Sequence, residues 1–196
     1  MKLGCILTLT AVMILLLSCA ALSYDAETDY MELMLTAAEA GDVESGRLAQ
    51  RSRDEKLADL ELDYGSVCFD DLYLLAKVIE SEAGSAWLPE DWKMAVGEVV
   101  LNRVASPEFP DTLSDVVYQP GQYSGSGSSY FQRLTPSRQS AEIAARLLGG
   151  ERVLNEPSVV FQSNAALGSG IFLEMEDKLL GTTYFCLSSR PELYCG

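Results

Sequence analysis

The segment DDLYLLAKVIESEAG, residues 70–84, predicts a helix that opens the main domain of the chain. Its apolar residues recur at the three- and four-residue spacing of a single helical face, which predicts that this face is buried. They are Leu72, Leu75, Ala76, Ile79 and Ala83. Asp70 or Asp71 is expected to cap the first turn, because an aspartate side chain accepts unpaired backbone N–H groups there. Gly84 is expected to end the helix in a left-handed conformation.

Near the end of this predicted helix, Glu82 is a candidate general acid. At about 100° per residue it falls at the edge of the apolar face, beside Leu75 and Ile79, whereas Glu80 points away from that face. Partial burial and the negative end of the helix both disfavour a carboxylate, so both raise the pKa of Glu82. Helix geometry alone does not prove catalysis, because most glutamates at helix ends have no catalytic role.

The chain contains no histidine, which makes a carboxylate acid more important. A Ser-His-Asp triad, a Cys-His pair and a histidine-ligated metal are all excluded. Cys68, Cys186 and Cys195 follow the leader described below, and their spacing does not resemble a zinc site. They form either one bridge, with Cys186 and Cys195 as the default pair, or three separate thiols. We expect neither a metal nor a cofactor.

Residues 1–24 have the pattern of a signal peptide, with Lys2 followed by an apolar run and then small residues. Leu16–Cys19 also matches a lipoprotein signal, in which Cys19 would be lipidated, and ordinary cleavage near Ala21 or Ser23 fits equally well. We therefore expect a secreted or cell-surface bacterial protein, attached to a membrane only through that anchor. The net charge of −15 repels phosphates, so nucleic acid is not an expected partner.

The remaining chain divides into a helical hairpin with its linker, residues 25–66, and a main domain, residues 67–196. Charged helical patterns before and after Gly41-Asp42 predict the hairpin. The favoured interpretation is a solvent-exposed arm that only packs on the domain. Within the domain we expect further helices over 90–104, 112–118 and 136–148, the first of them buried and central. Short strands are expected over 159–162 and 182–185. The fold class is α+β, mainly helical, with a small terminal strand pair.

Several motifs in order resemble the SleB-type cell-wall hydrolases, the spore-cortex-lytic family. They are LLAKVIESEAG at 74–84, MAVGEVVLNRV at 94–104, SPEFP at 106–110 and VYQPGQY at 117–123. The resemblance extends from about Asp71 to Cys186. It implies a lysozyme-like catalytic domain that acts on the glycan strands of peptidoglycan.

The resemblance also assigns residues to the site. The catalytic glutamate of the family falls on Glu82, and Gln122, Tyr123 and Asn102 become substrate-binding candidates. Tyr118 adjoins the loop at 119–130 that would line the glycan groove, and Asn164 falls in a late segment that matches the family loosely. The chain departs from the family after the motif, where Gly84-Ser85-Ala86-Trp87 replaces a stretch that usually contains arginine.

Members of this family are associated with lytic transglycosylation, which needs one acid. The hydrolytic alternative, a muramidase or glucosaminidase, needs a second carboxylate facing Glu82. Glu98 is the candidate, although a buried partner for Arg103 or another cation is the favoured interpretation of that residue. A further alternative is a wall-binding lipoprotein without catalytic activity. Peptidoglycan glycan strands are the expected partner in each case.

Overall fold

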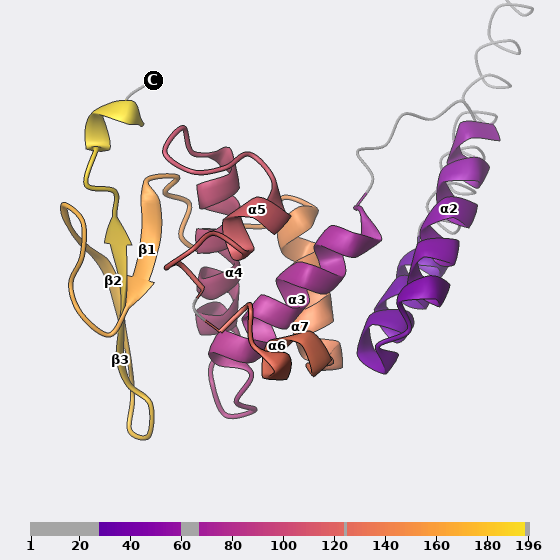
Figure 1. Cartoon of the computed structure of the whole chain (residues 1–196), viewed down its shortest axis with the longest axis horizontal. Coiled ribbons are helices and arrows are strands. Elements are labelled where there is room, and N and C mark those ends of the chain that lie inside the picture. The colour runs from indigo at the N-terminus through magenta and orange to yellow at the C-terminus, as the bar shows by residue number, and fades with distance from the viewer. Residues whose placement is uncertain (1–27, 60–66, 124, 195–196) are drawn as a thin grey trace, which may run out of the picture.

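A computed structural model of the chain describes residues 28–59, 67–123 and 125–194. Its helices and strands lie in three groups, with the sheet on one side, a set of helices in the middle and the N-terminal hairpin on the other side (Figure 1). The predicted signal peptide, Cys19 and the predicted linker at 63–66 lie outside the described residues. None of the described helices is both long and apolar enough to cross a membrane.

Three helices form the centre of the fold, and their sequences explain their burial. α3 (Phe69–Ala83) packs its apolar face against α4 (Glu90–Ala105) and α7 (Arg138–Leu148). α4 is buried on nearly every side, as its sequence predicted. The close approach of these helices depends on Gly97, because a Cβ there would lie 2.4 Å from Leu147 Cδ1.

The ends of α3 differ from the sequence prediction. Its N-cap is Cys68 without a side-chain cap, and Asp70 and Asp71 lie in the first turn instead. Gly84 follows the helix with a right-handed φ of −68°, so the expected left-handed stop is wrong. Glycine is nevertheless needed, because a Cβ at Gly84 would lie 2.2 Å from the backbone oxygen of Glu80.

Two short helices lie between α4 and α7. α5 (Leu113–Val117) is shorter than expected, and α6 (Ser129–Arg133) begins in a segment that was expected to be a loop. Each is capped by a hydroxyl at its N-terminus, from Thr112 and Ser128 respectively. A 3₁₀ turn, η1 (Pro191–Leu193), follows the last strand.

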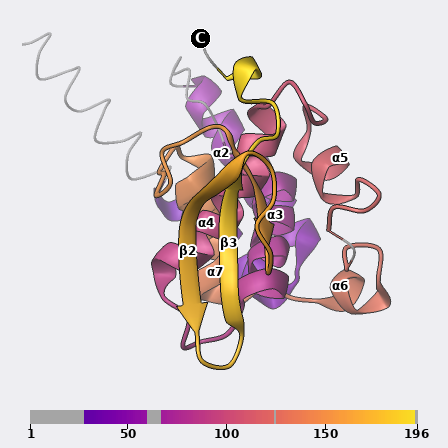
Figure 2. The same cartoon turned by 90° about the vertical axis from the view of Figure 1, so that its left-hand side faces the viewer.

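The sheet has three strands, one more than the sequence predicted. Its order is β1 (Val159–Ser163), β3 (Gly181–Leu187) and β2 (Gly170–Asp177), with both pairings antiparallel. β2 was missed because its sequence, GIFLEMED, carries three carboxylates and lies on an exposed edge. Figure 2 looks onto the sheet and shows β2 and β3 in front of the central helices. The mainly helical α+β class is confirmed.

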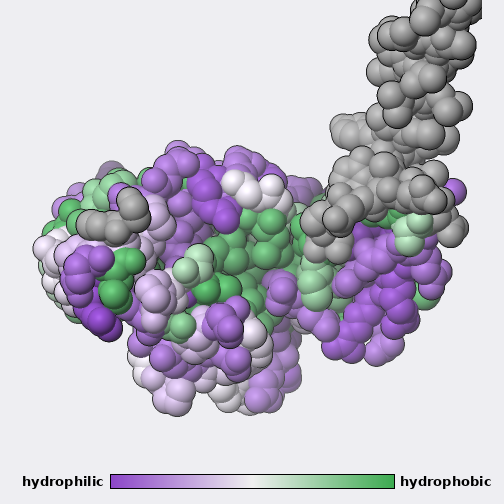
Figure 3. Space-filling view, turned by 90° about the horizontal axis from the view of Figure 1, so that it is seen from above, coloured by the Kyte–Doolittle hydropathy of each residue, from purple (hydrophilic) through white to green (hydrophobic). Residues whose placement is uncertain are grey.

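The N-terminal hairpin consists of a helix over 28–40 and α2 (Val43–Asp59). It contacts the start of α3, where Arg47 pairs with Asp70 at 2.9 Å and the Gln50 side chain accepts the backbone N–H of Phe69. It also contacts α7 through an ion pair of 2.6 Å between Glu32 and Arg138. Seen from above, the hairpin is largely hydrophilic, whereas hydrophobic surface gathers toward the middle of the molecule (Figure 3).

The hydrophobic core has two parts, and their boundary positions the site. The larger part lies among the helices and includes the apolar face of α3. The smaller part joins the end of α3, one face of α4 and the sheet, around Ala83, Trp92, Val96 and Phe185. Cys68 and Cys186 are free thiols among the described residues. Cys195, the predicted partner of Cys186, lies outside the described residues.

Candidate active site

Glu82 lies in the last turn of α3 and lines a pocket of about 150 Å³. The opposite walls come from α4 and from two strands of the sheet, so the pocket lies where the smaller core meets the surface. The other residues that line it are Trp92, Val96, Gln162, Ser163, Asn164 and Thr183. Glu82 is the only carboxylate among the lining residues.

The pKa of Glu82 is raised above its ordinary value. Desolvation is the largest cause, while hydrogen bonding from the Gln162 side chain and the positive charge of Arg103 lower the pKa in part. The side chain is exposed at the surface, but the carboxyl is surrounded by the protein atoms of the pocket walls, and these exclude part of its hydration. The direction agrees with the sequence prediction, and the residue can therefore hold a proton at a higher pH than a solvated glutamate.

Arg103, on α4, is the cation that acts on Glu82. Its side chain is only 4% exposed, and Nε donates to the backbone oxygen of Val160 at 2.6 Å. The guanidinium carbon lies 5.2 Å from the ring centre of Phe109 and 5.0 Å from that of Tyr123, which is cation–π geometry. No carboxylate among the described residues forms an ion pair with Arg103, and its Nη1 has no hydrogen-bond partner there. Its charge is therefore available to the pocket.

Tyr123 is buried and is not among the residues that line the pocket. Burial raises the pKa of its hydroxyl to about 12; the charge of Arg103 lowers it, and that of Glu82 raises it further. The hydroxyl has no hydrogen-bond partner among the described side chains and backbone groups. Tyr123 thus stays protonated and close enough to Glu82 and Arg103 for their charges to act on it.

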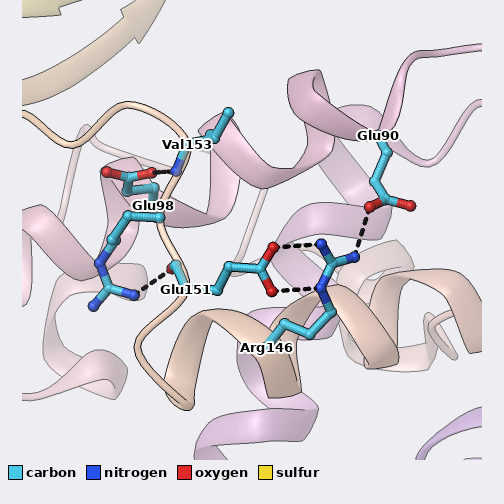
Figure 4. Close-up of polar contacts among 6 residues, drawn as sticks. Glu90, Glu98, Arg146, Glu151 and Val153 are labelled. Atoms are coloured by element: carbon cyan, nitrogen blue, oxygen red, sulfur yellow. Dashed lines mark hydrogen bonds and ion pairs between the residues drawn. The ribbon is translucent and has the colours of Figure 1, made fainter.

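Glu98 does not face the pocket and does not pair with Arg103. It is 1% exposed, and its carboxylate accepts three backbone N–H groups in the connection from α7 to β1. Val153 and Leu154 donate to Oε2 at 2.7 and 2.8 Å, and Asn155 donates to Oε1 at 2.9 Å. Figure 4 shows the contact with Val153. The favoured expectation of a cation partner is corrected, because backbone amides compensate this buried charge instead.

Asn102 is also turned away from the pocket. Its side-chain amide donates to the backbone oxygens of Glu156 and Val159, both at 3.0 Å, and the residue is buried. These bonds fasten the segment before β1 to α4. The structure therefore gives Asn102 a place in the scaffold rather than among the pocket-lining residues that the resemblance implied.

The remaining predicted site residues are divided between the pocket and its surroundings. Asn164 lines the pocket beside Glu82. Gln122 and Tyr118 are exposed on the segment that follows α5, outside the set of lining residues. The Tyr118 ring meets that of Phe131 edge-on at 6.5 Å. The structure thus brings Glu82 and Asn164 together, and Tyr123 is not among the lining residues.

Sequence reasoning did not identify Gln162, Trp92 and Thr183 as lining residues. Gln162 follows the apolar residues of β1, and a polar residue at the end of a buried strand was an available signal. Its Oε1 is buried without a hydrogen-bond partner in the described structure. Trp92 lies in the helix that was predicted to be buried, so the sequence did not indicate that it lines a pocket, and nothing near Thr183 in sequence indicates that it reaches Glu82.

Glu80, on the other side of the same helix, is a hydrogen-bonded carboxylate whose pKa is lowered. It accepts hydrogen bonds from the backbone N–H and hydroxyl of Ser137, at 3.0 and 2.6 Å, and from the Ser140 hydroxyl at 2.7 Å. Burial raises its pKa, but these hydrogen bonds outweigh burial, so the net pKa is lowered. Glu80 therefore joins α3 to the start of α7 as an ionised group, while Glu82 lines the pocket.

Comparison with known proteins finds a family to which part of the chain is similar. Residues 89–185 match the family described as Cell Wall Hydrolase. This part of the chain is therefore similar to the cell wall hydrolases. Glu82 precedes the matched residues, so the family match does not itself include it.

Relatives extend the similarity beyond the matched domain. A spore cortex-lytic enzyme from Halalkalibacterium halodurans is 26% identical over 132 residues, which are 67% of this chain and 38% of that protein. The Bacillus subtilis spore cortex-lytic enzyme is 27% identical over 124 residues, covering 62% and 39%. The chain thus spans less than half the length of these relatives.

A solved structure is similar as well. The catalytic domain of the germination-specific lytic transglycosylase SleB from Bacillus anthracis has a TM-score of 0.48 and 21% identity, over 63% of this chain and 99% of that domain. The catalytic domain of SleB from Bacillus cereus has a TM-score of 0.44 and 22% identity, over 63% and 94%.

Proposed function

We propose that this chain cleaves the glycan strands of peptidoglycan by lytic transglycosylation, with Glu82 as its acid and base. One observation carries the proposal: a carboxyl of raised pKa lines a pocket in which no other carboxylate lies. A protonated carboxyl at the pocket wall is what departure of a sugar oxygen requires. The relatives named for spore cortex lysis support peptidoglycan as the substrate.

In the first step, Glu82 donates its proton to the oxygen that links N-acetylmuramic acid to N-acetylglucosamine, and the bond to the anomeric carbon breaks. The resulting Glu82 carboxylate then takes the proton of the 6-hydroxyl of the same muramic acid. That oxygen attacks the anomeric carbon and closes a 1,6-anhydro ring. The carboxyl regains its proton at the end, so one residue serves both steps without water.

Arg103 supports the second step. During it Glu82 must exist as a carboxylate in a site whose desolvation disfavours that charge. The guanidinium of Arg103 offsets part of this penalty from within α4, where no carboxylate of the described chain neutralises it. The pKa of Glu82 is thus held between two opposing effects, which suits a residue that both gives and takes a proton.

The hydrolytic alternative lacks its second carboxylate in the pocket. Glu98, its candidate, is buried and occupied by three backbone N–H groups. We also infer an extracytoplasmic location, from the substrate and from the signal-peptide pattern of residues 1–24. Attachment through a lipid at Cys19 is part of this proposal.

The test compares Glu82→Gln with Glu80→Gln, a matched change of a carboxylate on the same helix. Digestion of purified peptidoglycan is followed by mass spectrometry of the released muropeptides. We expect Glu82→Gln to lose at least about 100-fold in rate, and Glu80→Gln to remain active. Anhydro ends on the products support transglycosylation, whereas reducing ends would show hydrolysis; full activity of Glu82→Gln would refute the role of this residue.

A further inference from the structure

Trp87 is a large side chain left in solvent next to the pocket. It lies in the connection between α3 and α4, five residues after Glu82, and 58% of it is exposed. Its neighbour Leu88 is buried in the smaller core, so the connection itself is anchored. The exposed apolar face of this tryptophan is surface on which a ligand can stack.

Asp177, at the end of β2, fixes the orientation of the indole. The indole N–H donates a hydrogen bond to the Asp177 carboxylate. The same carboxylate accepts the backbone N–H groups of Leu179 and Leu180, at 2.8 and 3.0 Å, and these bonds lower the pKa of Asp177. Trp87 and the tip of the β2–β3 hairpin are therefore held by one ionised group.

Exposed apolar residues are thus tied to Asp177 from both sides, and we refer to Trp87, Leu179 and Leu180 as the apolar patch. Leu179 is 77% exposed and Leu180 is 52% exposed. Because the indole N–H is already bonded, the part of Trp87 that remains available is its flat apolar face. Such a surface can stack on a flat apolar partner but cannot bind it through a hydrogen bond from the ring.

This patch borders the pocket of Glu82. Asp177 pairs with Gly181, and two residues along β3 lies Thr183, which lines the pocket. Two residues of a strand span about 7 Å, roughly the length of one sugar ring. Trp87 approaches from the other wall, through the short connection that follows Glu82.

We propose that Trp87, with Leu179 and Leu180, forms a stacking subsite for a sugar ring of the glycan strand next to the ring that is cleaved at Glu82. This inference rests on the proposed function for its substrate. Pyranose rings present apolar C–H faces of the size of an indole, and N-acetylglucosamine carries no charge. An anionic membrane is a poorer occupant, because the chain has a net charge of −15 and would be repelled.

The experiment measures binding apart from catalysis. Chitotetraose, a neutral oligomer of N-acetylglucosamine, is titrated calorimetrically into the mature chain that carries Glu82→Gln. Adding Trp87→Ala is expected to weaken binding roughly five- to tenfold, and Trp87→Phe to retain most of it. The matched control is Phe172→Ala, which removes a comparably exposed aromatic ring at the other end of β2.

Each outcome either supports or overturns the stacking subsite at Trp87. Equal affinities of the Trp87→Ala and Phe172→Ala proteins, or no measurable binding before Trp87 is changed, would overturn the subsite. Trp87-dependent sedimentation with anionic vesicles, in place of sugar binding, would assign the patch to a membrane. Peptidoglycan digestion is measured separately on the chain with Glu82 intact. If this chain releases no muropeptides, the proposed function is refuted. Weaker sugar binding by the Trp87→Ala protein would still support the subsite in that case.

Discussion

Replacing Glu98 by glutamine tests whether this buried carboxylate is part of the scaffold. Its two oxygens accept three backbone N–H groups at 2.7, 2.8 and 2.9 Å. Glutamine has the same shape, but its NH₂ group must face at least one of these donors. Hydrogen bonds to a charged acceptor contribute about 1.5 to 3 kcal/mol each, and an unpaired buried donor costs about 1 to 3 kcal/mol. We expect the free energy of unfolding to fall by about 3 to 5 kcal/mol.

Urea unfolding of the mature chain measures this loss, with Glu90→Gln as the control. Glu90 is on the same helix, but its ion pair with Arg146, at 2.6 Å, is largely exposed (Figure 4). Such a pair contributes about 1 kcal/mol or less, so the control should unfold almost as the original chain does. Peptidoglycan digestion is then assayed at a temperature at which the Glu98→Gln protein is still folded, and we expect it to persist.

The opposite pattern would refute the reasoning. An unchanged urea midpoint together with lost digestion would show that Glu98 acts on substrate and not on the backbone. It would revive hydrolysis with two carboxylates, and the pocket would have to open toward α4 to admit it.

Three further predictions concern the other charged groups. Arg103→Met should move the alkaline limb of the kcat/KM profile to higher pH, because the positive charge that lowers the pKa of Glu82 is removed. Arg103→Lys should leave the limb in place. An unmoved limb in both variants would contradict the effect of the Arg103 charge on Glu82. Because the raised pKa of Glu82 makes the folded state bind its proton more tightly, stability falls as pH rises through that pKa. Glu82→Gln should therefore unfold at a higher temperature than the original chain at pH ~7 and at the same temperature at pH ~3, below the unfolded pKa of about 4.3; equal temperatures at both would count against desolvation. Glu80 has a lowered pKa, so its stabilisation is present above its unfolded pKa and lost as pH falls through the folded pKa. Glu80→Ala should thus lose about 1 kcal/mol at neutral pH, as removal of a helix cap does, and less in acid, as urea midpoints can check.

The helices could be predicted from sequence because their signals are local. The apolar spacing of α3 and the nearly uniform burial of α4 follow from residues that are close in the chain. β2 could not, because its alternation is interrupted by a bulge between Ile171 and Leu173 and its outer face is acidic. An edge strand of this kind acquires its structure from pairing with β3, which is a property of the assembled sheet.

Some residues of the candidate site could likewise be predicted from the sequence, and others could not. Glu82 could be found from its place on a helix and from the resemblance of the surrounding motif. Gln162 and Thr183 could not, because they reach the pocket only through the docking of the sheet on α4. The partners of Glu98 were missed for a related reason: backbone N–H groups belong to every residue, so a sequence does not mark the three that converge on a carboxylate.

The arrangement of the pocket across both core regions has a consequence for when the chain can act. Glu82 comes from α3, while Gln162 and Thr183 come from strands near the C-terminus and Asn164 directly follows one of them. A chain with only its helices folded would carry Glu82 in water, with the acidity of a solvated glutamate. The raised pKa of Glu82 is therefore a property of the assembled domain, and it arises only when the C-terminal segments dock on α4.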